Sequence, residues 1–175
     1  MTDDDFTIQF RDGRPPETGE YPGHRPGARV DKSRGIVCEY DVGVEMRDGT
    51  TIYADIFRPE GAEDAPPLVA WAPYGKHYPD SKGWDTRPGS GVPAADLSEY
   101  AIFEGPDPEY WCANGYAIVH ADPRGSWGSE GDLTFMTEQE ARDCADLIEY
   151  LGEADWSNGK VGMIGVSYLA WTQWR

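Results

Sequence analysis

The chain has 175 residues, of which 39% are hydrophobic and 13% aromatic, and its formal net charge is −17 at pH 7. This length fits one domain, and the apolar content is sufficient to build a core. The acidity argues against partners such as nucleic acid or an anionic membrane. No run of roughly 18 apolar residues is present, so no membrane helix is expected. The acidic start Met1–Asp5 lacks a signal-peptide core.

The three cysteines, Cys38, Cys112 and Cys144, are an odd number without the spacing of a metal motif. We expect free thiols in a reducing cytosol, which predicts a cytoplasmic protein. Cys144 falls on the apolar face of a predicted helix, which favours burial over catalysis. The histidines and aspartates do not have zinc-site spacing, and we expect neither a metal nor a cofactor.

The chain is predicted to begin with an arm and a hairpin. Residues 1–35 are rich in Pro, Gly, Arg and Asp without an apolar period, so we expect an extended or disordered arm. Order is expected from Ile36 onward. Residues 40–46 alternate between apolar and polar, an Asp-Gly pair at 48–49 supplies a tight turn, and a second run covers 51–58. This pattern predicts a β-hairpin.

Two continuous apolar runs follow, at residues 68–72 and 116–121, and each is typical of a strand buried on both faces. Residues 73–108 between them carry many Gly and Pro and no clear period, as in a functional loop or a disordered segment. A short helix is predicted directly after this region, at 109–113. A Gly-rich loop then covers 122–135.

A Thr-x-x-Glu capping box at residues 137–140 predicts the start of a helix. In such a box Thr137 accepts from the Glu140 amide while the Glu140 side chain reaches back. An apolar stripe continues from 141 to 151, and residues 160–165 read as the next strand. Strands and helices that alternate after a hairpin predict an α/β fold with parallel central strands.

The segment Gly165-Val166-Ser167 follows the apolar run 161–164 and precedes a helix-like stretch. A strand, a Gly-x-Ser and a new helix form the pattern of a nucleophile elbow, in which a sharp turn presents a serine at its tip. Gly165 meets the need for a small neighbour at that turn. The alternative is an ordinary strand-to-helix turn in another α/β protein, which Gly-x-Ser alone does not exclude.

Several further segments, in order, carry a resemblance to a known family. They are residues 40–59, Ala72-Pro73-Tyr74, Asp122-Pro123-Arg124-Gly125 to Gly131, residues 158–169 and Thr172-Gln173-Trp174. The chain resembles the X-Pro dipeptidyl-peptidase / cocaine-esterase (CocE/NonD) hydrolases from Ile36 onward, which implies the N-terminal part of an α/β-hydrolase catalytic domain. The family elbow reads Gly-x-Ser-Tyr-x-Gly, and here Ala170 replaces its last glycine, adding a methyl group at the turn.

The resemblance also implies the parts of an active site. Ser167 is the nucleophile, the Tyr74 hydroxyl donates to the oxyanion, and the backbone amide of Tyr168 is the second donor. Each such donor can be worth about 3 kcal/mol in acyl transfer. The alternative for Tyr74 is a core or rim aromatic.

Asp122 and Arg124 precede the serine, whereas the acid and base of this fold follow it. We therefore interpret both as structural, with Gly125, Gly128 and Gly131 permitting tight turns.

No histidine of the chain is expected to be the catalytic base. His24 lies in the predicted arm and His120 in a buried strand. His77 follows Tyr74 near the expected mouth of the site, where it is either a surface residue or a substrate contact. We therefore expect the triad acid and histidine beyond residue 175, together with the helical cap and C-terminal jelly-roll domain of the family.

These observations predict a serine hydrolase of acyl bonds whose substrate is a small-molecule ester or an X-Pro-type peptide. The alternative is a non-catalytic remnant or an inactive binding module of α/β-hydrolase origin. The 175-residue chain alone is expected to be inactive, because Ser167 has no base. It is also expected to be poorly stable, because its last strand would leave an open apolar edge.

Overall fold

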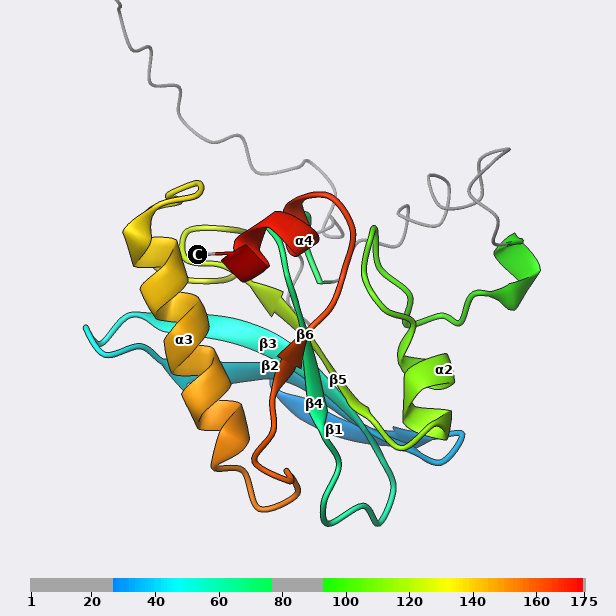
Figure 1. The fold of residues 1–175 in the computed structure, drawn as a ribbon. Coiled ribbons are helices and arrows are strands. Elements are labelled where there is room, and N and C mark those ends of the chain that lie inside the picture. Colours follow the sequence, from blue (N-terminus) through cyan, green and yellow to red (C-terminus); the bar gives the residue numbers. More distant parts are fainter. Residues whose placement is uncertain (1–26, 77–92, 175) are drawn as a thin grey trace, which may run out of the picture.

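The computed structural model describes residues 27–76 and 93–174 (Figure 1). They form a six-stranded sheet in the order β1-β2-β3-β5-β4-β6. The strands are β1 (Arg29–Ser33), β2 (Ile36–Glu45), β3 (Thr51–Pro59), β4 (Pro67–Trp71), β5 (Ala117–Asp122) and β6 (Gly162–Met163). Strands β1, β2 and β3 are antiparallel, β3 meets β5 antiparallel, and β4 is parallel to β5 and β6. The predicted α/β fold with parallel central strands is confirmed.

The predicted hairpin is strands β2 and β3, and Gly49 makes its turn with φ 85°. The structure differs from the prediction before Ile36, where residues 29–33 form β1 and pair with β2. Four of the five β1 residues are exposed, as at a sheet edge, so the strand carries no apolar pattern. The predicted arm before residue 27 lies outside the described residues.

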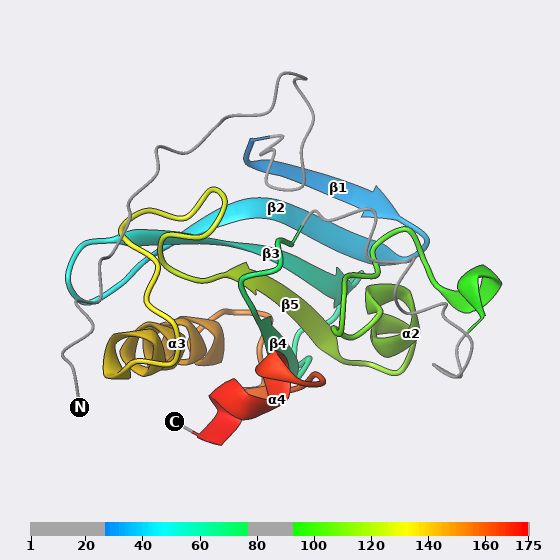
Figure 2. The same ribbon diagram turned by 90° about the horizontal axis from the view of Figure 1, so that it is seen from above.

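Helices cover both faces of the sheet. Helix α3 (Glu138–Gly152) packs on the face that carries Val119, and helix α2 (Pro108–Ala113) packs on the face that carries Ile118. Figure 2 shows the two helices on opposite sides of β5. All six β5 residues are buried, which confirms the prediction from its continuous apolar run. Cys38, Cys112 and Cys144 are buried free thiols.

Helix α3 begins at the predicted cap, with one difference. Thr137 accepts a hydrogen bond from the Glu140 amide at 3.3 Å, as predicted. The Glu140 side chain, however, reaches the amide of Met136, one residue before the cap, at 2.6 Å. Its other oxygen is thereby turned inward, toward β4 and the segment after β6.

The last predicted strand is shorter than expected. Strand β6 covers only Gly162–Met163, because the chain turns away after the Ile164 amide donates to Val69 at 3.0 Å. Helix α4 (Tyr168–Trp171) and the 3-10 helix η3 (Thr172–Trp174) follow. Figure 1 places α4 at the end of the sheet where β5 and β6 point.

The long region between β4 and β5 is described only in part. Residues 77–92 lie outside the described residues, and the 3-10 helix η2 (Ala94–Asp96) follows them. The predicted short helix is α2, capped by Asp107, whose carboxylate accepts from the Glu109 amide. No helix within residues 27–76 and 93–174 is both long and apolar enough to cross a membrane.

Candidate active site

Ser167 lies at a sharp turn between β6 and α4. Its backbone has φ 57° and ψ −117°, a conformation that costs a non-glycine residue about 1–3 kcal/mol. The residue is exposed, and it lies at the carboxyl end of the parallel strands. This geometry presents the serine side chain at the tip of the turn, as in a nucleophile elbow.

The neighbours of Ser167 fit this turn. Gly165 has φ 150°, and a Cβ atom there would lie 2.2 Å from Cβ of Leu169, so only glycine fits. Ala170 lies in α4, outside the positive-φ region, and its amide donates to the Ser167 carbonyl at 3.1 Å. The backbone conformation at Ala170 therefore does not require the glycine of the family pattern.

Tyr74 follows strand β4 and lies beside Ser167. Its ring packs edge-on against Phe103, with 5.1 Å between ring centroids, and against Tyr168, at 6.2 Å. Burial raises the pKa of the Tyr74 phenol, the Glu104 carboxylate adds to the rise, and a hydrogen bond with the Ser167 side chain opposes it. The phenol is therefore protonated at neutral pH and able to donate.

Tyr168 is the first residue of α4. Within the described part of the chain its amide makes no backbone hydrogen bond, whereas the next three amides donate to Val166 and Ser167. Such an orphan amide at a helix start is available to an anion. The Tyr168 side chain points inward, with 8% of its surface exposed, and its hydroxyl donates to Glu140 at 2.6 Å.

Glu140 links the elbow to the rest of the fold, a role that the sequence analysis missed. The oxygen that accepts from Tyr168 also accepts from the Trp71 indole at 3.0 Å. Its second oxygen holds the Met136 amide. Glu140 thus connects α3, the end of β4 and the elbow. A glutamate at this capping position is normally interpreted only as part of the cap.

The segment after Tyr74 contains a buried lysine, Lys76, which the sequence analysis also missed. The ammonium of Lys76 donates to Asp41 and, at 3.0 Å, to Asp55. The Lys76 amide donates to the Asp122 carboxylate at 3.0 Å. Burial raises the pKa of Asp122 to about 7, and the nearby Lys76 opposes that rise.

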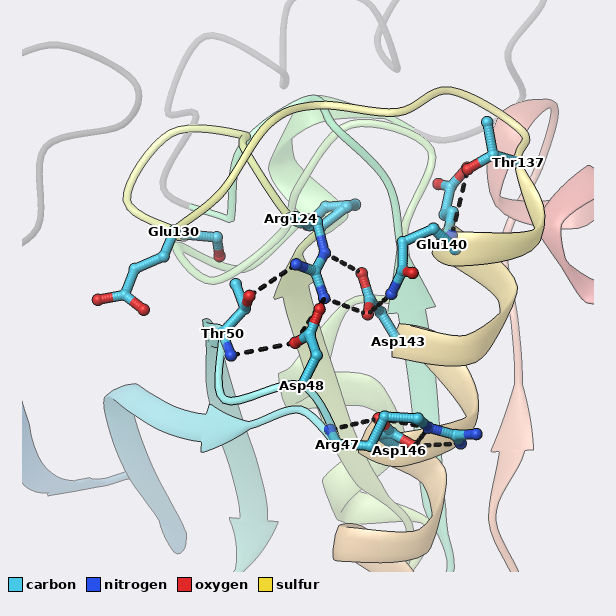
Figure 3. A network of polar contacts seen from close by, with 12 residues as sticks. Arg47, Asp48, Thr50, Arg124, Glu130, Thr137, Glu140, Asp143 and Asp146 are labelled. Carbon is cyan, nitrogen blue, oxygen red and sulfur yellow. Dashed lines mark hydrogen bonds and ion pairs between the residues drawn. The ribbon is translucent and has the colours of Figure 1, made fainter.

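Arg124 fixes the loop after β5. Its guanidinium donates to Asp143 on α3 at 2.7 and 2.8 Å and to Thr50 at 2.6 Å, and it pairs with Asp48 at 2.9 Å (Figure 3). These contacts join the loop to α3 and to the β2–β3 turn. They agree with a structural interpretation of Arg124.

The glycines of this loop are not equivalent. Gly125 has φ 69°, and a Cβ atom there would lie 2.1 Å from the Leu133 amide nitrogen. Gly131 also has a positive φ, of 80°. Gly128 lies in the turn closed by the hydrogen bond from the Ser129 amide to the Ser126 carbonyl at 2.9 Å, and its φ is not positive.

The histidines are placed as follows. His120 is fully buried, with its Nε2 atom 3.1 Å from the Pro106 carbonyl and its ring 5.2 Å from that of Phe57, so it is a core residue as predicted. His24 and His77 lie outside the described residues. Among residues 27–76 and 93–174, no group of three or more His, Cys, Asp and Glu side chains is arranged to hold a metal ion.

A strained, exposed serine at the carboxyl ends of parallel strands, in a sheet with helices on both faces, defines the α/β-hydrolase class. Residues 48–175 match the family of X-Pro dipeptidyl-peptidases known as S15, and the chain belongs to this family.

The relatives include esterases and peptidases. The cocaine esterase of Rhodococcus sp. (strain MB1 Bresler) is 34% identical over 135 residues, which are 77% of this chain and 20% of that protein. The Xaa-Pro dipeptidyl-peptidase of Lactobacillus helveticus (strain DPC 4571) is 35% identical over 102 residues, 49% of this chain and 12% of that protein. The chain thus spans a fifth or less of these relatives.

The fold has solved counterparts. A CocE/NonD family hydrolase from Staphylococcus aureus superposes with a TM-score of 0.71 and 38% identity, over 79% of this chain and 24% of that one. An α-amino acid ester hydrolase superposes with a TM-score of 0.58 and 31% identity, over 90% of this chain and 25% of that one. The fold prediction is therefore confirmed.

Proposed function

We propose that the protein is a serine hydrolase of acyl bonds, cleaving an ester or an X-Pro-type peptide, and that Ser167 is its nucleophile. The observation that carries this proposal is the positive-φ turn that exposes Ser167 beside the Tyr74 phenol. Membership of a family of peptidases and the similarity to named esterases support the same reaction class.

The reaction proceeds in two steps. The Ser167 hydroxyl oxygen bonds to the substrate carbonyl carbon while a base takes its proton, and the carbonyl oxygen becomes an oxyanion. The Tyr74 hydroxyl and the Tyr168 amide donate to this oxyanion. Its collapse expels the alcohol or amine, which receives the proton. Water then attacks the acyl-serine in the same way and releases the acid.

The base and its acid partner are part of the proposal. Residues 27–76 and 93–174 contain one histidine, His120, which is fully buried in the core. In this fold the acid and the histidine follow the serine along the chain. We place both beyond residue 175. We also place the protein in the cytoplasm, because its three free thiols fit a reducing compartment.

The decisive experiment uses the protein expressed from its full natural reading frame. Hydrolysis of p-nitrophenyl esters and of X-Pro p-nitroanilides is measured for the wild type and for Ser167→Ala. We expect the substitution to lower kcat by at least about 10⁴-fold, because the nucleophile is lost. Undiminished turnover in Ser167→Ala would refute the proposed nucleophile.

A second measurement tests the missing base. The 175-residue chain alone should hydrolyse p-nitrophenyl esters no faster than an unrelated protein, because without a base Ser167 keeps its proton at neutral pH. Turnover that vanishes in Ser167→Ala would place a base within residues 1–175. A full-length protein without turnover or labelling by a fluorophosphonate would instead favour an inactive module.

A further inference from the structure

Tyr74 stands in a short segment that follows β4 and also contains a buried residue, Lys76. The Tyr74 ring is partly exposed at the candidate site, whereas the Lys76 side chain, two residues later, has no exposed surface. Lysine is almost never fully buried without charged partners. The position of this ammonium beside the candidate oxyanion donor therefore calls for a physical explanation.

Two strands of the hairpin supply the partners of Lys76. The carboxylates of Asp41 on β2 and Asp55 on β3 both accept from its ammonium, and each is buried. The register of β2 against β3 shifts between Glu39 and Val42, and Asp41 has φ 50° within that irregularity. A bulge of this kind redirects a side chain. Here it brings Asp41 to Lys76.

The backbone on both sides of Tyr74 is held as well. The Lys76 amide donates to Asp122 at 3.0 Å, and the indole of Trp127 donates to the Pro73 carbonyl at 2.9 Å. Between them Gly75, with φ 97°, lies under the Trp127 ring, and a Cβ atom there would approach the ring to 3.0 Å. The segment is thus fixed before and after Tyr74.

Stability alone does not account for these charges. Removing an ammonium and its carboxylates from water carries a desolvation cost that the mutual attraction often fails to offset, and apolar side chains of similar volume are often as stable. The ion pairs do provide one defined position for the segment. If the segment moved, Lys76 would lose its partners, and an unpaired buried charge is strongly unfavourable.

We infer that Lys76 is a positioning residue for the oxyanion hole. Its buried ion pairs with Asp41 and Asp55 hold the segment from Pro73 to Lys76 so that the Tyr74 hydroxyl stays directed at the developing oxyanion. The inference rests on the proposed function of Tyr74. A displacement of about 1 Å at such a group is enough to cost roughly 10²-fold in rate.

A double-mutant cycle in the full-length protein tests this role. We expect Lys76→Met to lower kcat by roughly 10–100-fold with little change in KM, because the substrate is still bound while the donor is displaced. In a Tyr74→Phe background the same substitution should cost less than about 3-fold, since the group that it positions is already absent. A purely structural role for Lys76 would instead lower kcat equally in both backgrounds, and that result overturns the inference.

Two controls separate the possible failures. Lys32→Met removes an exposed lysine that pairs with Glu60 at 2.8 Å, and it should leave kcat unchanged. If Tyr74→Phe itself retains wild-type kcat while Ser167→Ala abolishes it, the proposed role of Tyr74 fails and the inference fails with it. If Tyr74→Phe is impaired but the cycle is additive, only the inference about Lys76 fails.

A milder variant covers the case in which Lys76→Met does not fold. Asp55→Asn keeps the side-chain shape and leaves the ion pair between Lys76 and Asp41 in place. With 3-fluorotyrosine incorporated at position 74, we expect Asp55→Asn to broaden or split its fluorine resonance, because the segment gains a second position. An unchanged single resonance would contradict the inference without reference to activity.

Discussion

The two tyrosines beside Ser167 are held by different chemistry. The Tyr168 hydroxyl donates to one buried carboxylate, that of Glu140, which also accepts from two other neutral donors, the Trp71 indole and the Met136 amide. The Tyr74 segment is anchored by a buried ammonium between aspartates. Glu140 is held by hydrogen bonds from neutral donors, whereas the position of Lys76 depends on the pairing of buried charges with Asp41 and Asp55. Substitutions that change charge, and changes in pH, should therefore affect the Tyr74 segment more than the surroundings of Tyr168.

The largest expected difference in kcat is between the variants that remove the Tyr74 hydroxyl and the Tyr168 hydroxyl. Tyr74→Phe should lower kcat by roughly 10²–10³-fold with little change in KM, because its hydroxyl matters once charge develops on the substrate oxygen. Tyr168→Phe should lower kcat by less than about 10-fold, because this residue would act through its backbone amide. Steady-state kinetics of the full-length protein measure both values.

A third variant checks the assumed order of the triad. His77→Ala should keep most of kcat, because the histidine of this fold follows the serine. Loss of activity in His77→Ala together with wild-type kcat in Tyr74→Phe would show that both the donor and the triad order are wrong.

Removal of the Glu140 side chain should affect stability more than any other substitution around Tyr168. Glu140→Ala leaves the Trp71 indole, the Tyr168 hydroxyl and the Met136 amide without their acceptor, which should lower the free energy of unfolding by about 3 kcal/mol or more. Glu140→Gln keeps one accepting oxygen and should lose about half as much. Urea unfolding measures both, and equal losses would contradict the shared-acceptor arrangement.

The pH dependence of stability tests the buried charges around Lys76. Burial raises the pKa of Asp122 from 3.8 to about 7. Between these values the folded protein retains a proton that the unfolded chain has released. The free energy of unfolding therefore falls as pH rises from about 4 to about 7, by at most about 1.4 kcal/mol per pH unit from this group.

Asp122→Asn removes this titration while keeping an oxygen for the Lys76 amide. Urea unfolding between pH 4 and pH 8 should then show a shallower decline in the variant than in the wild type. A variant with the wild-type slope would mean that Asp122 does not titrate in this range.

The smallest effect is expected at Ala170. Ala170→Gly restores the family pattern, yet the site is helical, so we expect a loss of stability of up to about 1 kcal/mol and no change in kcat beyond 2-fold. Thermal unfolding and steady-state kinetics measure the two. A gain in kcat would show that the methyl group does hinder the elbow.

The sequence predicted the elements whose apolar pattern is strong. The hairpin, β4, β5, α3 and the turn at Ser167 were all found, because period, capping and glycine signals agree there. Strand β1 was missed, since an exposed edge strand carries no apolar period. Strand β6 was predicted too long, because its apolar run continues into the turn.

The polar anchors of the site were not predictable in the same way. Asp41 and Asp55 occur in strands where a polar residue usually faces solvent, and only the packing of distant segments buries them. Lys76 stands in a loop whose sequence has no apolar period. Glu140 belongs to a capping box, which by itself explains a glutamate at that position. Tyr74 was predicted as an oxyanion donor only because the family resemblance distinguished it from the other tyrosines.

Asp41 marks a place where stability-guided engineering would mislead. Its φ of 50° is a conformation that glycine adopts without strain, so a consensus or design procedure that scores backbone geometry would replace it. Such a change relieves local strain but removes a partner of the Lys76 ammonium. Breaking a buried ion pair from one side costs about 3–5 kcal/mol, more than the strain that is relieved, so the product would be both less stable and less active.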